Sequence, residues 1–283
     1  MRIVQKNNRK VTLVYEELPT KSVYNLLLMS DLHIDSVYCN RELLIKHLNM
    51  AKKDDMKVII NGDLFDAMQG RHDPRRSAKE LKAIYKDDAY FDTLVADATG
   101  FLMPYKGQIV LMAYGNHEES VIRNSGTDIL RRVADELDVT VGSYKGFIRF
   151  LFRREGGGGG RNSFTIHYNH GTSGSAPVTK GMLESFRSLV TVRDADLLIY
   201  GHLHTNYIHY DTVEGLTNSG NLVYNKIASV RLPSYQGLTP FQERASNSLP
   251  LNGCVQVRIE YENGIVDYNL IEHFENPKPQ QEV

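Results

Sequence analysis

Carboxylate, amide and imidazole side chains occur in five short clusters of the sequence, and each cluster suits the binding of divalent cations. The clusters are Asp31-x-His33, Gly62-Asp63-x-x-Asp66, Gly115-Asn116-His117-Glu118, His170-Gly171 and Gly201-His202-x-His204. Oxygen and imidazole ligands without a thiolate favour hard and borderline metal ions. The glycines allow the backbone to turn sharply and to approach a bound ion closely. These residue types therefore predict a metal site.

Each cluster directly follows a short apolar segment that has the character of a buried strand. These segments cover residues 23–29, 57–60, 108–113, 162–168 and 196–200. Ligands of open α/β sheets bind beyond the carboxyl ends of the strands, so five such ends can converge on one site. Taken alone, Gly62-Asp63 is an ordinary turn and Asn116-His117-Glu118 an ordinary helix cap. The series as a whole predicts metal binding.

The spacing of apolar residues in the rest of the sequence predicts an α/β protein. Helical spacing occurs at 41–53, where Asn40 is the expected N-cap, at 77–102 with a break near Asp87-Asp88, at 127–137 with Thr127 as cap, and at 178–190. Further strands are expected at 11–15, 146–153, 206–211, 222–230, 254–261 and 265–271. Strands and helices alternate first and strands predominate later, which predicts two sheets packed face to face.

The chain of 283 residues is expected to form a single domain over residues 1–274, followed by a frayed tail at 275–283. Gly156 to Gly160 are expected at a flexible hairpin tip. No apolar stretch approaches the roughly 20 residues of a membrane helix. Met1 to Lys10 lack the apolar segment of a signal peptide, and the two cysteines are compatible with a reducing compartment. We therefore expect a cytoplasmic protein without a membrane partner.

In series, the five clusters resemble the signature blocks of the calcineurin-like metallophosphoesterase superfamily, over roughly residues 24–210. The resemblance implies a four-layer α/β/β/α sandwich of two mixed β-sheets flanked by helices, and a binuclear metal centre. The residues that it assigns to the first metal are Asp31, His33 and His204, those assigned to the second are Asn116, His170 and His202, and the bridging residue is Asp63. Two divalent ions about 3.5–4 Å apart would activate a water molecule and stabilise a phosphoryl group. We expect manganese, with Fe, Zn, Ni, Co and Mg as alternatives.

The resemblance also implies that His117 is catalytic. This histidine would contact the phosphoryl group or protonate the leaving oxygen, and Asp66 would orient it. A loop cap is the alternative role for Asp66, and Glu118 is expected to support the loop. His170 is preferred to His167 as a ligand because His170 ends its strand and precedes a glycine.

The motifs constrain the substrate less than the reaction. Phosphodiesterases of the DNA-repair nuclease type share Gly62-Asp63-Leu64-Phe65, but they usually place a histidine where this chain has Asp66. Asp66 and the Gly-Asn-His-Glu form are more similar to protein or small-molecule phosphatases. However, the arginine that follows closely in protein phosphatases is absent here. Neither subfamily is matched cleanly.

A basic segment between Arg71 and Lys86 includes Arg75 and Arg76, and it is expected either at the rim of the site or on a solvated helix face. Because the formal net charge is only −1, any attraction to nucleic acid must be local. Arg231, Tyr235 and Phe241 could stack on a base or pack in a loop.

From these features we predict a phosphodiesterase that acts on DNA, RNA or nucleotides. The first alternative is a phosphomonoesterase for proteins or small molecules. A non-catalytic scaffold is less favoured, because every ligand position and His117 are present.

Overall fold

A computed structural model describes residues 1–67, 82–86, 88–154, 162–172, 179, 181–217, 219–239, 251–262 and 264–276. Several predicted features lie outside these residues: Arg75, Arg76, Gly156 to Gly160, Phe241 and the tail from residue 277 onward. Among the described residues, the strands form two mixed sheets, which we call sheet A and sheet B.

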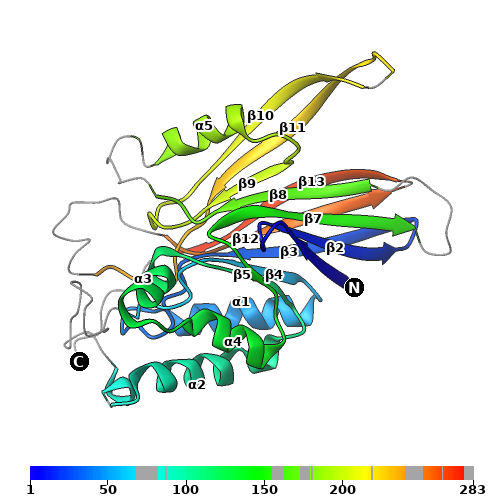
Figure 1. The fold of residues 1–283 in the computed structure, drawn as a ribbon. Coiled ribbons are helices and arrows are strands. Elements are labelled where there is room, and N and C mark those ends of the chain that lie inside the picture. Colours follow the sequence, from blue (N-terminus) through cyan, green and yellow to red (C-terminus); the bar gives the residue numbers. More distant parts are fainter. Residues whose placement is uncertain are drawn as a thin grey trace.

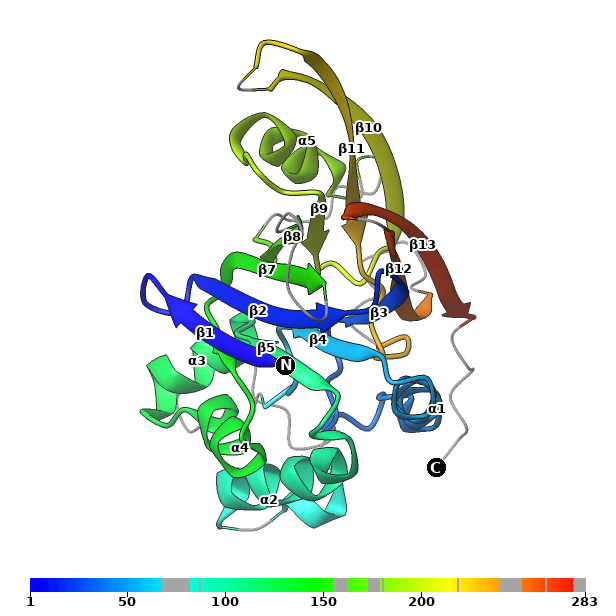
Figure 2. The ribbon, with the colours of Figure 1, turned by 90° about the vertical axis from the view of Figure 1, so that its right-hand side faces the viewer.

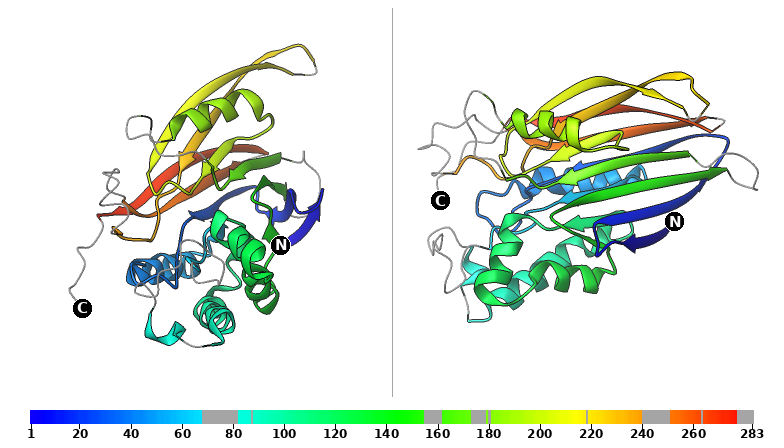
Figure 3. Two further views of the ribbon diagram at one scale, coloured as in Figure 1. Left: turned by 60° about the vertical axis from the view of Figure 1, so that its left-hand side comes forward. Right: turned by 45° about the horizontal axis from the view of Figure 1, so that its top comes forward.

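Sheet A contains seven strands in the described part of the chain. In their spatial order they are β1 (Arg2–Lys6), β2 (Val11–Leu18), β7 (Lys145–Arg154), β8 (Asn162–Asn169), β9 (Leu197–Tyr200), β11 (Leu222–Arg231) and β10 (Tyr207–Leu216). β8, β9 and β11 run parallel, whereas β10 is antiparallel to β11. These strands lie side by side in the right-hand view of Figure 3, and the β10–β11 hairpin extends away from the body in Figure 2.

Sheet B contains six strands among the described residues. Their spatial order is β13 (Ile265–Glu275), β12 (Asn252–Glu262), β3 (Lys21–Met29), β4 (Lys57–Asn61), β5 (Ile109–Ala113) and β6 (Val141–Gly142). β3, β4, β5 and β6 are parallel, and β12 joins β3 antiparallel. Both faces of the parallel strands are covered, which explains their continuous apolar sequences.

Helices cover the outer faces of both sheets. They are α1 (Arg41–Lys53), α2 (Tyr90–Leu102), α3 (Asn116–Ser125), α4 (Ile129–Leu137) and α5 (Met182–Thr191), with short 3-10 turns η2 (Ala83–Tyr85) and η3 (Met103–Tyr105). Figure 1 shows α5 on the sheet A side of the stack and α1, α2 and α4 on the sheet B side. The predicted four-layer α/β/β/α sandwich is confirmed.

Apolar side chains fill each of the three spaces between layers. Leu27, Leu44 and Leu130 belong to the cluster between sheet B and its helices. Leu26 and Phe150 belong to the cluster between the two sheets. Leu198, Tyr200 and Ile227 form a smaller cluster with Leu189 of α5. Neighbouring residues of β3 thus point into different layers, as the alternation of a strand requires.

Several boundaries differ from the sequence predictions. Within the predicted helix 77–102, the described residues become α-helical only at Tyr90. The cap of α4 is Asp128 and not Thr127, because the Asp128 carboxylate accepts a hydrogen bond from Arg131 N at 3.0 Å. The predicted cap Asn40 is confirmed, since its side chain accepts from Leu43 N at 3.1 Å. No described helix is both long and apolar enough to cross a membrane.

Candidate dimetal centre

Five strands of the two sheets end beside one another and deliver the predicted ligands to one place. Asp31 follows β3 and Asp63 follows β4, while Asn116 begins α3 shortly after β5. His170 follows β8, and His202 and His204 follow β9. Hydrogen bonds join these loops: Asp31 N donates to Gly62 O at 3.1 Å within sheet B, and His202 N donates to Asp31 Oδ1 at 3.0 Å between the two sheets. The loops of sheet A and sheet B therefore form one site.

Asp31, His33 and His204 form the first group of potential ligands. His204 Nε2 lies 3.3 Å from Asp31 Oδ1 and 3.2 Å from His33 Nε2. One ligand atom from each of the three residues fits within 4.8 Å of the others, as metal binding requires. Asp31 and His33 are buried.

Asp63, His170 and His202 form the second group. His170 Nε2 lies 3.0 Å from Asp63 Oδ2 and 3.1 Å from Asn116 Oδ1. The same amide oxygen lies 2.7 Å from His202 Nδ1. Asn116 thus contributes a neutral oxygen among the imidazoles.

Asp63 links the two groups, because it belongs to the second and lies close to His33 of the first. Besides His170, it approaches His117, whose Nε2 is 3.8 Å from Asp63 Oδ2. His33, Asp63 and His117 also satisfy the spacing of a metal-binding group. Geometry alone therefore allows His117 either as a ligand or as a neighbour of the metal centre.

The electrostatics of the site favour bound cations. Asp31 and Asp63 are buried, and within the described residues neither forms an ion pair with lysine or arginine. Burial lowers the pKa of His170, but Asp63 and Asp31 outweigh this effect and raise it to about 10. Burial likewise opposes protonation of His33, yet Asp66 and then Asp63 raise its pKa to about 9. The negative charges of Asp31 and Asp63 are therefore stabilised by nearby positive charge. Divalent ions can supply this charge when they bind to the imidazole nitrogens and carboxylate or amide oxygens.

A family model described as calcineurin-like phosphoesterase matches residues 24–206, which include every residue of both groups. The chain belongs to this family. Membership supports metal-dependent hydrolysis of phosphate esters as the reaction class, while the type of substrate is open.

Solved structures with a related fold come from several organisms. Vps29 of Chaetomium thermophilum has 10% identity and a TM-score of 0.35, with 90% of this chain and 100% of that chain covered. GAP50 of Plasmodium has 10% identity and a TM-score of 0.41, with 92% and 90% covered. A predicted phosphoesterase of Streptococcus pneumoniae has 13% identity and a TM-score of 0.31, with 90% and 99% covered. Similarities this low carry no information on function. No curated protein matches the sequence.

In this calcineurin-like chain, the Asp66 carboxylate lies closer to His33 than to His117. Asp66 Oδ1 is 3.3 Å from His33 Nδ1 and 3.6 Å from His117 Nδ1. The nearest partner of His117 Nδ1 is instead the backbone carbonyl of Asp66, at 2.6 Å. A donating Nδ1–H leaves the other nitrogen of His117, Nε2, facing the site.

Several supporting residues of this phosphoesterase-family site could not be assigned from the sequence. The Asp35 carboxylate accepts from Asp66 N at 2.6 Å and from Ala67 N at 2.8 Å. Ser30 Oγ donates to Asp31 Oδ2 at 2.5 Å. His170 Nδ1 lies 2.9 Å from Asn61 O, which fixes the ring orientation. Apart from the contact between the neighbours Ser30 and Asp31, these contacts join segments far apart in the sequence, so no local sequence pattern marks them.

Glu118 supports the loops, as the sequence predicted. Its carboxylate accepts hydrogen bonds from the backbone nitrogens of Asp63 at 3.1 Å, Phe65 at 3.1 Å and Gly115 at 2.8 Å. Because this side chain is fully buried, it cannot contact a substrate. It instead holds the β4 and β5 loops together.

The backbone at most of the predicted ligands is left-handed. Positive φ angles occur at Asp31 (52°), His33 (44°), Asp63 (49°), His202 (70°) and His204 (53°). For residues other than glycine this conformation costs roughly 1–2 kcal/mol each. Such strain persists only where surrounding contacts impose it, and it concentrates at functional sites.

The described residues that the sequence also suggested belong to neither group of potential ligands. Arg231 and Tyr235 are fully buried, so neither can stack on a substrate base. The Arg231 guanidinium pairs with Glu184 at 3.2 Å. His167 packs against Phe147 and belongs to neither ligand group. Arg75 and Arg76 lie outside the described residues.

Proposed function

We propose that this chain is a two-metal phosphodiesterase that acts on nucleic acid or nucleotides. The observation that carries the proposal is the pair of ligand groups that Asp63 links, with His117 beside them. When bound, two divalent ions lower the pKa of a water molecule and offset charge on the phosphoryl oxygens. The proposed ligands of the first ion are Asp31, His33 and His204, those of the second are Asn116, His170 and His202, and Asp63 is shared.

His117 is proposed as the proton donor to the leaving oxygen. The Asp66 carbonyl accepts from His117 Nδ1–H, so the proton that is transferred is the second one of the protonated ring, on Nε2, and its loss leaves the neutral Nδ1–H imidazole. The His117 side chain is only slightly exposed, at 12%. Its backbone nitrogen donates to Asp63 Oδ1 at 3.0 Å, which ties the position of the ring to the shared carboxylate.

The metal content tests the proposed centre directly. We expect two divalent ions per chain after loading with Mn²⁺, measured by elemental analysis of the folded protein. Fe, Zn, Ni, Co and Mg are to be compared in parallel, since the ligand set accepts each of them. One ion or none per folded chain would contradict the binuclear centre.

The preference for diesters rests on weaker support. The Gly62-Asp63-Leu64-Phe65 sequence and the basic segment containing Arg75 and Arg76 favour it, whereas Asp66 favours a monoesterase. A manganese-supplemented panel of aryl phosphomonoester, aryl phosphodiester, cyclic nucleotides and single- and double-stranded DNA decides between them. A wide preference for the monoester would support the alternative of a protein or small-molecule phosphatase. Absence of all turnover by a metal-loaded protein would support a scaffold.

Charge reversal tests the proposed rim. In the Arg75→Glu, Arg76→Glu double variant, we expect the ratio of oligonucleotide to aryl-diester kcat/KM to fall. We also expect the rate on the oligonucleotide to depend less on salt, because fewer counterions are released on binding. If both substrates lose activity equally, the basic segment does not contact flanking phosphates.

A further inference from the structure

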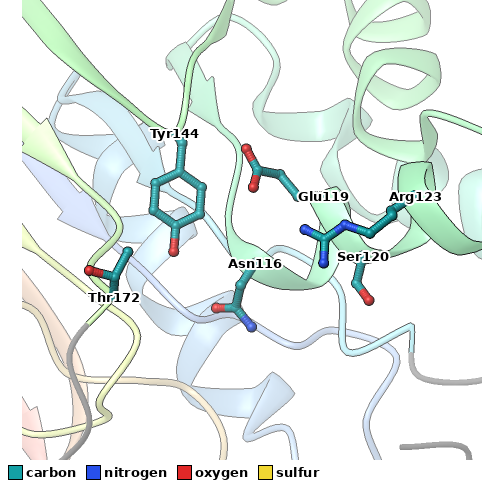
Figure 4. Close-up of a pocket in the computed structure, with 6 residues that line it drawn as sticks. All are labelled: Asn116, Glu119, Ser120, Arg123, Tyr144 and Thr172. Carbon is teal, nitrogen blue, oxygen red and sulfur yellow. The ribbon is translucent and has the colours of Figure 1, made fainter. Parts of the chain in front are cut away.

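A pocket of about 460 Å³ opens beside Asn116. Its walls come from three segments: α3, the turn before β7 and the segment after β8. Figure 4 shows the lining residues, which are Asn116, Glu119, Ser120, Arg123, Tyr144 and Thr172. Small-molecule sites usually have volumes of about 300–1,000 Å³, so this space, the α3 pocket, can hold a group as large as a nucleotide.

The α3 pocket and His117 lie on different sides of the candidate metal centre. Asn116, Glu119, Ser120 and Arg123 follow helical spacing of three, four and seven residues, so they share one face of α3. His117 leaves that face and packs edge-on against His33, with ring centroids 4.9 Å apart. The pocket lies instead on the His170 side, where the Tyr144 ring meets His170 at 5.5 Å.

This separation assigns the two ester groups of a phosphodiester to different places. The leaving oxygen must lie near His117, because His117 is the proposed proton donor. In an in-line displacement the retained ester oxygen does not share the direction of the leaving oxygen, and the α3 pocket beside Asn116 is the space that can take the group on it. A phosphomonoester has no such group and would leave this pocket without a ligand.

The lining residues also indicate the chemistry of that group. Arg123 presents a guanidinium, which binds phosphate through paired hydrogen bonds. Glu119 presents a carboxylate, which accepts hydrogen bonds from sugar or base and disfavours a purely polyanionic ligand. No ion pair joins Glu119 to Arg123 in the described part of the chain, although they lie four residues apart on α3. The Tyr144 hydroxyl donates to Gly171 O at 2.5 Å, which holds the ring as a fixed wall.

On the basis of the proposed function, we infer that the α3 pocket binds the nucleotide retained on the scissile phosphate, with Arg123 contacting the next phosphate of that nucleotide. Specificity for a nucleic-acid strand would then arise from α3, the same helix that carries Asn116 and His117. The basic segment around Arg75 plays no part in this inference.

Two esters with one leaving group test the inference. The 5′-(4-nitrophenyl phosphate) of thymidine 3′-phosphate places a nucleotide and a second phosphate on the retained side, whereas methyl 4-nitrophenyl phosphate places only a methyl group there. With the manganese-loaded full chain, we expect Arg123→Ala to lower the ratio of their kcat/KM values about 10-fold or more, mainly through KM for the nucleotide ester. Arg131→Ala, on α4, is the matched control and should leave this ratio at its wild-type value.

Binding without turnover separates this inference from the proposed function. We expect titration calorimetry with thymidine 3′,5′-bisphosphate to show a Kd about 10-fold higher for Arg123→Ala than for wild type. A protein that binds the bisphosphate through Arg123 but hydrolyses no ester would overturn the proposed function and keep the pocket. An unchanged kcat/KM ratio, or equal bisphosphate affinity in both proteins, would overturn the pocket assignment.

Discussion

Asp63 is the side chain on which both halves of the candidate centre depend, because it lies 3.0 Å from His170 of the second group and within 4.8 Å of a ring nitrogen of His33 of the first. Replacing one Asp63 carboxylate oxygen by an amide nitrogen removes the negative charge that both ions would share. We therefore expect Asp63→Asn to abolish turnover and to weaken both metals. Calorimetric titration with Mn²⁺ measures the second effect, and retention of two tight sites would contradict a bridging role.

His117 should behave differently from Asp63. Its Nδ1 is held by the Asp66 carbonyl, and its Nε2 stays 3.8 Å from Asp63 Oδ2. His117→Ala is expected to keep both metals and to lose about 10²–10⁴-fold in rate, the usual contribution of a general acid. Elemental analysis and kcat are measured on the same preparation. An empty metal site in this variant would make His117 a ligand.

Asp66 separates the two histidines further. The family resemblance implies that Asp66 orients His117, but its carboxylate lies nearer to His33 Nδ1. Burial raises the pKa of Asp66, yet the contact with His33 outweighs this effect and lowers the pKa below its ordinary value. We expect Asp66→Asn to lower the affinity for the metal held by His33 by roughly 10–100-fold, the usual effect of removing a group that orients a metal ligand. A pure loss of kcat with both metal affinities intact would instead restore the role implied by the family.

At the scale of the elements, the strand ends could be predicted and the loop geometry could not. The continuous apolar runs of β3, β4 and β5 reveal strands buried on both faces, and the polar residues after each run mark its end. The left-handed backbone at Asp31 and Asp63 has no such signal, since it results from contacts between loops. The supporting contacts of Asp35 have the same origin. The sequence therefore indicates which residues come together at the candidate site, but it does not indicate how their side chains are oriented.

Gly115 illustrates how closely the β4 and β5 loops pack. A Cβ at this position would overlap with Asp63 Oδ1 and the Asp63 backbone nitrogen, although φ at Gly115 is an ordinary −111°. We expect Gly115→Ala to displace Asp63, to lower metal affinity and to destabilise the fold by about 1–3 kcal/mol. Mn²⁺ titration and thermal unfolding measure the two effects.

Gly100 provides the matched control, because it lies within α2 and a Cβ there meets nothing within 4 Å. Gly100→Ala should stabilise the protein by about 0.5–1 kcal/mol through its greater helix propensity, with metal affinity unchanged. Equal metal loss in the two variants would show that the effect of Gly115→Ala is not local.

At the scale of the whole molecule, the packed layers also bury groups that titrate near neutral pH. Burial, with a smaller effect of Lys145, lowers the pKa of His167 from 6.5 to about 4. Between about pH 6.5 and 4, His167 therefore binds a proton in the unfolded chain but not in the folded chain. Stability from the neutral imidazole is complete above about pH 6.5 and is lost as the pH falls toward 4, by at most about 3 kcal/mol.

We expect His167→Gln to make the free energy of unfolding less dependent on pH between about 6.5 and 4. Urea unfolding at a series of pH values measures this slope. His209→Gln is the control for the substitution itself, because it makes the same replacement at a side chain that is 37% exposed. A slope that His167→Gln leaves unchanged would show that other groups control acid unfolding.

The pairing of β3 with β12 has a consequence for biosynthesis. β3 and β4 are made before β12, so Leu28 finds its partner Val255 only after more than 200 further residues have been made. At about 5–20 residues per second, Asp31 precedes His204 by on the order of 10 s or more. Throughout this interval one edge of β3 in the nascent chain has no partner strand. Such an edge can bind chaperones or pair with other chains and start aggregation. Metal capture by the complete centre must therefore wait until His204 has been made.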